Sequence, residues 1–142
     1  MAYAYVNTPV AYRPKGLNTA LWAVQVVLGL MFAAVGAMKV FQPISALVAS
    51  LPFAATFPPA LIRFIGIAEL AGAIGLIVPA ATRIAPGLTP LAGTGLTVVM
   101  VLASVFHLSR GEFGNLPVTI LLGALAAFVA WGRWSGARIE GR

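Results

Sequence analysis

The 142-residue sequence contains no cysteine and no aspartate, and it has a single histidine. Without cysteine, the chain forms no disulfide bond or thiolate metal site and performs no thiol redox chemistry of its own. One histidine and three glutamates supply too few ligands for a self-contained metal centre. A Ser-His-Asp triad is impossible, although a glutamate could stand in for the aspartate. We therefore expect no metal site and no catalytic activity of the chain's own.

Charged residues are also scarce, at 8% of the chain, whereas hydrophobic residues make up 61%. A soluble globular domain usually carries about 25% charged residues, and a disordered chain needs low hydrophobicity and high charge. The composition excludes both classes and predicts that a lipid bilayer surrounds most of the chain.

Four stretches reach the roughly 20 apolar residues that a membrane-spanning helix needs, namely residues 18–38, 61–80, 88–108 and 117–134. No stretch alternates apolar and polar side chains as a membrane β-barrel would. The links after the second and third stretches are short, which makes consecutive helices antiparallel neighbours. Pro58-Pro59 suits the first turn of the second helix, and Asn115 is a candidate cap for the fourth. The sequence predicts an all-α membrane protein, an antiparallel four-helix transmembrane bundle.

The link between the first two stretches is longer and still apolar. Ile44, Leu47, Val48 and Leu51 recur at the spacing of one helical face. Prolines at positions 43, 52 and 58 argue against a fifth crossing. We expect a short interfacial helix here, packed under the mouth of the bundle.

The chain divides into an N-terminal lead-in (1–17), a transmembrane domain (18–134) and a C-terminal tail (135–142). The lead-in is polar and aromatic, with Tyr3, Tyr5, Tyr12 and Arg13, and it lacks the pattern of a cleavable signal peptide. The last four residues, 139–142, spell a protease-recognition tag or form a native tail, and they are left out of the functional reasoning.

Lysines and arginines set the expected orientation. Six of them fall on the side of the two termini and three on the other side, which places both termini in the cytoplasm and the chain in the cell membrane. Arg83, Arg133 and Arg138 are interpreted as determinants of this topology. Because the positive charges are scattered singly at helix ends, we expect no nucleic-acid partner.

Glu69 is the clearest candidate for a functional group, because an ionisable side chain inside a bilayer is costly unless it faces a partner or water. Its helical neighbours are small: Gly66, Gly72 and Ala73. Small residues mark the faces where membrane helices approach closely. We therefore expect Glu69 to point into the bundle.

Lys39, Arg63 and His107 belong to the same half of the bundle as Glu69, which the charge count makes the extracytoplasmic half. These four residues are the candidate ligand-binding set. A pair of Glu69 and His107 could pass a proton or hold a polar head group such as a quinone carbonyl. Three alternatives remain open: Glu69 forms a structural ion pair with Lys39 or Arg63, His107 is merely solvated, and the two cations extend to the interface. Gln25 is expected to hydrogen-bond across helices.

The sequence resembles the DoxX-like family of small four-helix membrane proteins over about residues 21–135. The segments that carry the resemblance are LGLMFAAVGAMKVF (28–41), FIGIAELAGAIGLIVPAATRIAPGLTPLA (64–92), VFHLSRGE (105–112) and GRWS (132–135). Within them, Lys39 and Phe41 resemble a first family signature, the Glu69–Gly72 run a second, and His107 a third.

The resemblance implies association with a membrane-bound, quinone-linked oxidoreductase assembly, in which this chain would be an accessory subunit. Quinone or a lipid-like molecule is then the expected ligand, and a membrane protein or a second copy of the chain the expected partner. Two other functions stay open, a small-solute or lipid carrier and a membrane assembly factor or chaperone. A carrier needs a polar path across both halves. A chaperone needs an exposed face of small residues, which Gly93, Gly95, Gly123 and Ala127 could provide.

Overall fold

A computed structural model describes residues 15–142, and within this range the regular secondary structure is entirely helical. The expected lead-in residues Tyr3, Tyr5, Tyr12 and Arg13 lie outside the described residues. Four long helices dominate the fold: α1 (Lys15–Phe41), α3 (Pro59–Thr82), α4 (Leu88–Ser109) and α5 (Leu116–Trp131). Each is long and apolar enough to cross a membrane, with α5 counted together with the short helical turns on either side of it. The predicted membrane bundle is confirmed.

The helix ends lie within three residues of the predicted ones. α1 starts at Lys15 and ends at Phe41, and α3 is two residues longer than predicted at each end. The fourth span differs in kind, because its α-helix stops at Trp131 and a π-helical turn, η3 (Gly132–Gly136), completes it.

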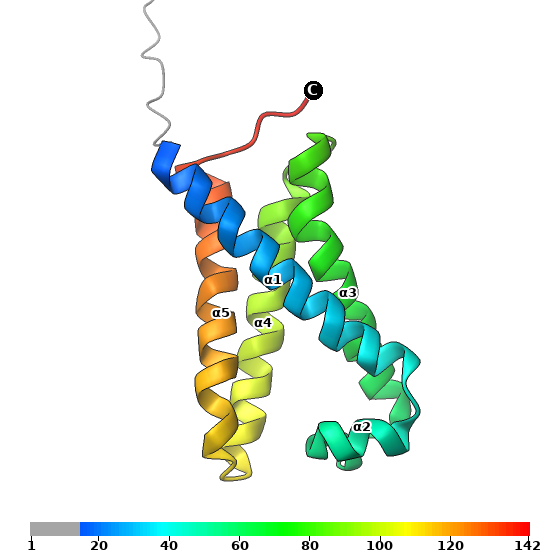
Figure 1. The fold of residues 1–142 in the computed structure, drawn as a ribbon. Coiled ribbons are helices and arrows are strands. Elements are labelled where there is room, and N and C mark those ends of the chain that lie inside the picture. Colours follow the sequence, from blue (N-terminus) through cyan, green and yellow to red (C-terminus); the bar gives the residue numbers. More distant parts are fainter. Residues whose placement is uncertain (1–14) are drawn as a thin grey trace, which may run out of the picture.

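The helices pack as two pairs (Figure 1). α1 packs chiefly against α3, and α4 packs chiefly against α5, while α3 and α4 join the pairs. Figure 1 shows α1 crossing the other three long helices obliquely, so that its first turns approach the end of α5. We call the end of the bundle where α1 begins and α5 finishes the terminal end.

The opposite end carries α2 (Ile44–Ser50) and η1 (Pro52–Ala55), which lie crosswise to the long helices (Figure 1). We call it the α2 end. Leu47, Ala54 and Ile62 are buried together there, with Ile44, Val48 and Leu51 packed around them. The predicted apolar face of the short helix is confirmed, and it closes the α2 end of the bundle.

The core of the bundle is apolar, and so is much of its outer surface. The core is formed by residues from all four long helices: Leu21, Leu28, Phe32, Ala73, Leu76, Leu96, Met100, Ala126 and Val129. Large apolar side chains such as Leu30, Phe64, Leu102 and Ile120 are more than half exposed. Contiguous exposure of this kind suits acyl chains and not water.

Three details of the connections concern the helix ends. Pro59 occupies the first position of α3, as predicted. Arg83 ends α3 in the left-handed conformation with φ 59° and opens the short turn to α4. The prediction that the Asn115 side chain caps α5 is wrong. Asn115 precedes α5, but its side chain makes no capping hydrogen bond and lies instead against His107.

Candidate functional site

Glu69 forms a buried ion pair with Lys39. The Lys39 Nζ donates to Glu69 Oε1 at 2.6 Å, and both side chains are less than 10% exposed. Gly36 and Gly66, each one helical turn before one of the pair, let α1 and α3 approach closely at this level. The small-residue face thus places Glu69 inside the bundle, as predicted. The sequence left Lys39 and Arg63 open as the partner of Glu69, and the structure shows that the partner is Lys39.

Arg63, the second cation of the candidate set, bonds to the backbone of α1 and not to Glu69. Its Nη1 donates to the backbone carbonyl oxygen of Lys39 at 2.5 Å. That carbonyl belongs to the last turn of α1, where carbonyl groups lack partners within the helix. Arg63 therefore links the start of α3 to the end of α1 through the backbone of Lys39, the residue whose side chain binds Glu69.

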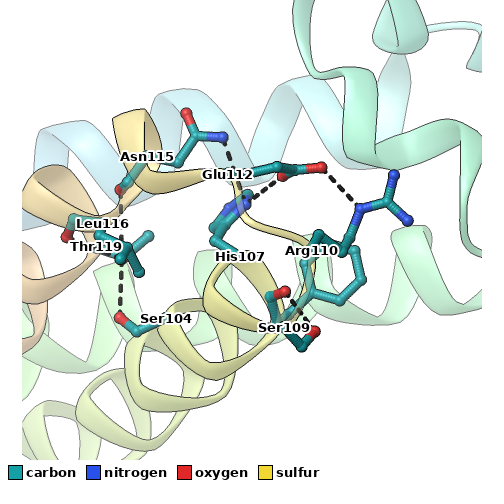
Figure 2. Close-up of polar contacts among 9 residues, drawn as sticks. Ser104, His107, Ser109, Arg110, Glu112, Asn115, Leu116 and Thr119 are labelled. Atoms are coloured by element: carbon teal, nitrogen blue, oxygen red, sulfur yellow. Dashed lines mark hydrogen bonds and ion pairs between the residues drawn. The ribbon is translucent and has the colours of Figure 1, made fainter.

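His107 forms a second polar group with the loop that follows α4 (Figure 2). Its Nδ1 lies 2.7 Å from Glu112 Oε2, and Asn115 Nδ2 lies 3.3 Å from the same nitrogen. Arg110 Nε donates to the other oxygen of Glu112, Oε1, at 2.7 Å. His107 itself is buried, so it is not a merely solvated interfacial histidine.

The hydrogen bond from Arg110, and after it the one from His107, hold the pKa of Glu112 below its usual value. Glu112 therefore remains a carboxylate at neutral pH and bridges the two basic side chains. Sequence analysis did not single out Glu112 as a ligand of His107. The signal was the spacing: a loop residue five positions after a helix-ending histidine lies within reach of its ring.

The expected direct pairing of Glu69 with His107 is wrong for the described residues. Each takes another partner, Lys39 for the carboxylate and Glu112 for the imidazole. The Phe53 ring contacts both groups. Lys39 Nζ lies 5.7 Å from its centroid, and the His107 ring meets it edge-on at 6.0 Å.

Phe53 belongs to an aromatic cluster that brings two segments together at the α2 end. Phe106 packs against Phe53 at 6.5 Å between ring centroids and against Phe57 at 4.7 Å. The Arg110 guanidinium lies 5.5 Å from the Phe106 centroid. The site is therefore a buried ion pair and a histidine-carboxylate group that share an aromatic wall.

One atom in this site lacks a partner. Among residues 15–142, Glu69 Oε2 is buried and accepts no hydrogen bond. A buried acceptor without a donor is costly. The arrangement can therefore accept one hydroxyl or amine donor at Oε2, beside the positive charge of Lys39.

A second polar cluster occupies the terminal end, where sequence analysis missed it. Arg133 is 4% exposed, and its Nε donates to Gln25 Oε1 at 2.6 Å. Its Nη1 donates to Asn18 Oδ1 at 2.7 Å and to the Ala137 carbonyl oxygen at 2.9 Å. Arg133, interpreted from the sequence as a determinant of topology, thus also has a structural role inside the bundle. The available signal was that Asn18 and Gln25 lie seven residues apart, two turns along one face of α1.

Gln25 also confirms the expected hydrogen bond across helices. Its Nε2 donates to the Leu76 carbonyl oxygen of α3 at 2.6 Å. Gln25 thereby links α1, α3 and the turn after α5 in one chain of hydrogen bonds.

A comparison with protein-family models matches residues 23–129 to the DoxX-like family. Neither the curated proteins nor the solved structures yield a match. The matched span covers most of the chain and includes Lys39, Arg63, Glu69 and His107. The expected resemblance is confirmed, and the chain belongs to the DoxX-like family of integral membrane proteins.

Proposed function

We propose that this membrane protein is a non-catalytic accessory subunit of a quinone-linked redox assembly. In this proposal, the α2 end of the bundle binds the head group of a quinone or of its reduced form, the quinol. The cell membrane is the proposed location, with both termini in the cytoplasm, because the excess of lysine and arginine lies at the terminal end.

The observation that carries the proposal is the unpartnered Oε2 of Glu69 beside Lys39. A quinol carries hydroxyl groups, and one of them can donate to that oxygen. A quinone carries carbonyl oxygens, which can accept a hydrogen bond from the Lys39 ammonium. Both forms therefore find a complementary group in the same ion pair.

The aromatic cluster supports a flat ring as the ligand. The Lys39 ammonium lies over the face of the Phe53 ring, and the His107 ring meets the Phe53 ring edge-on. Offset or edge-on contacts between aromatic rings contribute about 0.5–1.5 kcal/mol beyond their buried area. A quinone ring bound beside Phe53 would replace part of the contact between the Phe53 and His107 rings. Phe53 would then lose one ring contact and gain another.

The carrier alternative is less well supported. Polar groups occur at both ends, Lys39 with Glu69 at one and Gln25 with Arg133 at the other. On α1, however, Gln25 and Lys39 are separated by roughly 21 Å of helical rise. The buried positions between them include Leu28 and Phe32, which belong to the apolar core. A polar solute would have to cross that core.

The chaperone alternative also loses part of its basis. Gly93 and Gly123 lie buried between α4 and α5, where a Cβ would meet Ala126 or Met100 at 3.0–3.1 Å. Only Gly95 and Ala127 of that expected small-residue face are exposed. The face serves packing within the chain.

The test is equilibrium binding of a short-tailed quinone and its quinol to the detergent-purified protein. Glu69→Gln should weaken quinol binding about tenfold or more, because hydrogen bonds to charged groups contribute about 1.5–3 kcal/mol. His107→Ala should weaken it less, since His107 is not itself bonded to the ion pair. The matched control is Thr89→Val, which removes another buried and unpartnered oxygen within residues 15–142, near the start of α4.

Folding of Glu69→Gln must be checked by its helical circular dichroism and melting temperature. Phe53→Leu provides a second variant that keeps both charges and removes only the aromatic face. Absence of binding by the unmodified protein, or equal affinity in Glu69→Gln and Thr89→Val, would rule the proposal out.

A further inference from the structure

Basic side chains from four parts of the chain converge on the terminal end, away from the quinone site proposed above. Lys15 begins α1, Arg83 ends α3, and Arg133 and Arg138 follow α5. Figure 1 places these helix ends at the same end of the bundle, with the C-terminal tail running from the end of α5 toward the end of α3. The backbone amide of Arg142 donates to the Arg83 carbonyl oxygen at 3.2 Å, which holds the tail in that place.

Two adjoining cavities lie among these basic residues. The larger, of about 400 Å³, is lined by Lys15, Asn18, Trp22, Arg83, Arg138 and Glu140, among others. The smaller, of about 180 Å³, is lined by Arg133, Trp134 and Arg138 together with the turn between α3 and α4. Arg138 borders both, so the two spaces lie side by side at the edge of the bundle, and we call them together the basic recess.

Arg133 forms a buried, polar part of the wall of this recess. Its side chain is 4% exposed, and its hydrogen bonds within residues 15–142 go to neutral groups, namely Gln25, Asn18 and a backbone carbonyl. Its ring neighbour, Trp22, lies 5.4 Å from the guanidinium and is neutral as well. The third nitrogen, Nη2, is buried and donates to no described atom. A buried guanidinium with a spare donor favours an anionic acceptor.

The surface beside the recess is apolar. Ile84, Leu88, Leu91 and Trp134 are each about half exposed or more. These residues lie at the membrane edge by helix position, where the acyl chains of a lipid begin just below its head group. A basic recess with an apolar flank matches the two parts of one phospholipid molecule.

We propose that the recess binds the phosphate head group of an anionic phospholipid, with Lys15, Arg83 and Arg138 at its mouth and Arg133 in its wall. Basic pockets between transmembrane helices are the usual form of such sites. Free phosphate shares the head-group chemistry, but it would gain nothing from the apolar flank.

The experiment is native mass spectrometry of the full chain in detergent with added phosphatidylglycerol or phosphatidylcholine of equal chain length. We expect phosphatidylglycerol to be retained in preference. Lys15→Gln and Arg83→Gln should each lower its affinity about fivefold, the effect of one basic residue near a membrane surface. Both side chains are exposed, so neither change threatens folding.

Arg110→Gln is the matched control, because it removes one exposed positive charge from the α2 end. Equal retention of the two lipids, or an equal loss in Arg110→Gln and Arg83→Gln, would overturn the proposal. A competition arm with inorganic phosphate separates the two sources of the head group. Displacement of the lipid by millimolar phosphate would show an adventitious anion site and would likewise overturn it. None of these results depends on quinone binding.

Discussion

Gly36 and Gly66 face each other reciprocally across the α1–α3 contact. A Cβ added to either glycine would lie 2.9 Å from the carbonyl oxygen of the other. Real Cβ atoms do not approach a backbone atom so closely, and the backbone cannot move aside as a flexible side chain could. The pair therefore sets the spacing of the two helices one turn before Lys39 and Glu69.

Gly66→Ala should consequently destabilise the protein by about 1–3 kcal/mol, the usual cost of overpacking. The measurement is the melting temperature in detergent, followed by circular dichroism. Gly95→Ala in α4 is the control, because a Cβ there meets nothing within 4 Å. Alanine at that position should leave the melting temperature unchanged or raise it, as alanine favours helix. Similar losses in the two variants would contradict the close-contact interpretation.

The Lys39–Glu69 pair should show strong coupling. Lys39→Met and Glu69→Gln should each lower the free energy of unfolding by about 3–5 kcal/mol, because each leaves a buried polar or charged group without its partner. The double variant should lose much less than the sum, since it contains no buried charge at this place. A double-mutant cycle on unfolding in mixed detergent micelles measures the coupling. Additive losses would mean that the ion pair contributes nothing specific.

Glu112 should make stability depend on pH in the acid range. Its pKa is lowered in the folded protein, so its contribution is fully present above its ordinary value of 4.5 and is lost as the pH falls through the lower, folded-state pKa. The melting temperature of the unmodified protein should exceed that of Glu112→Gln at pH 6, and the difference should shrink below about pH 4.5.

Arg110→Gln tests the cause of that lowered pKa. Without the Arg110 hydrogen bond, the pKa of Glu112 should move back toward its ordinary value, so the stabilising effect should be smaller and its loss should be complete at a higher pH. The single histidine provides an independent NMR reporter, because its ring nitrogen resonances sense the Glu112 contact directly. A melting-temperature difference that stays constant from pH 6 to pH 3 would contradict this account.

Arg133→Lys should destabilise the terminal end although it keeps the charge. Lysine lacks the planar fork with which Arg133 reaches Gln25, Asn18 and the Ala137 carbonyl oxygen at once. We expect a loss of about 1.5–3 kcal/mol, the contribution of one hydrogen bond to a charged group. Arg83→Lys is the control, because Arg83 is exposed and should tolerate the change within about 0.5 kcal/mol. An equal effect of the two substitutions on the melting temperature would disprove the role given to the guanidinium.

The fold could be predicted from the sequence because lipid imposes a simple rule on length and polarity. Stretches of about 20 apolar residues become helices, and short links such as residues 83–87 leave little choice of topology. The apolar face of residues 44–51 was equally readable, because its spacing has one geometric meaning. Even the inward direction of Glu69 followed from the small residues around it.

The partners within the site were less predictable. Glu69 had two cations in the same half of the bundle, and only the depth of Lys39 on α1 decides between them. His107 was considered as a partner of Glu69, but the loop after α4 places Glu112 against its ring. Arg133 lies in the last turn of the fourth span, which winds as a π-helix, and its side chain bonds to Gln25 and Asn18 of α1. Such a local change in winding leaves no mark in hydrophobic periodicity.

The division of the bundle into an α1–α3 pair and an α4–α5 pair has a consequence for biogenesis. The turn at residues 83–87 separates two hairpins, and each of them contains the more extensive packing of its own helices, α1 with α3 and α4 with α5. The first hairpin can therefore insert and close around its ion pair while the second is still being synthesised. Assembly of the finished protein then requires lateral docking of the two halves within the bilayer, along α3 and α4 and between α1 and the end of α5, where Arg133 meets Gln25.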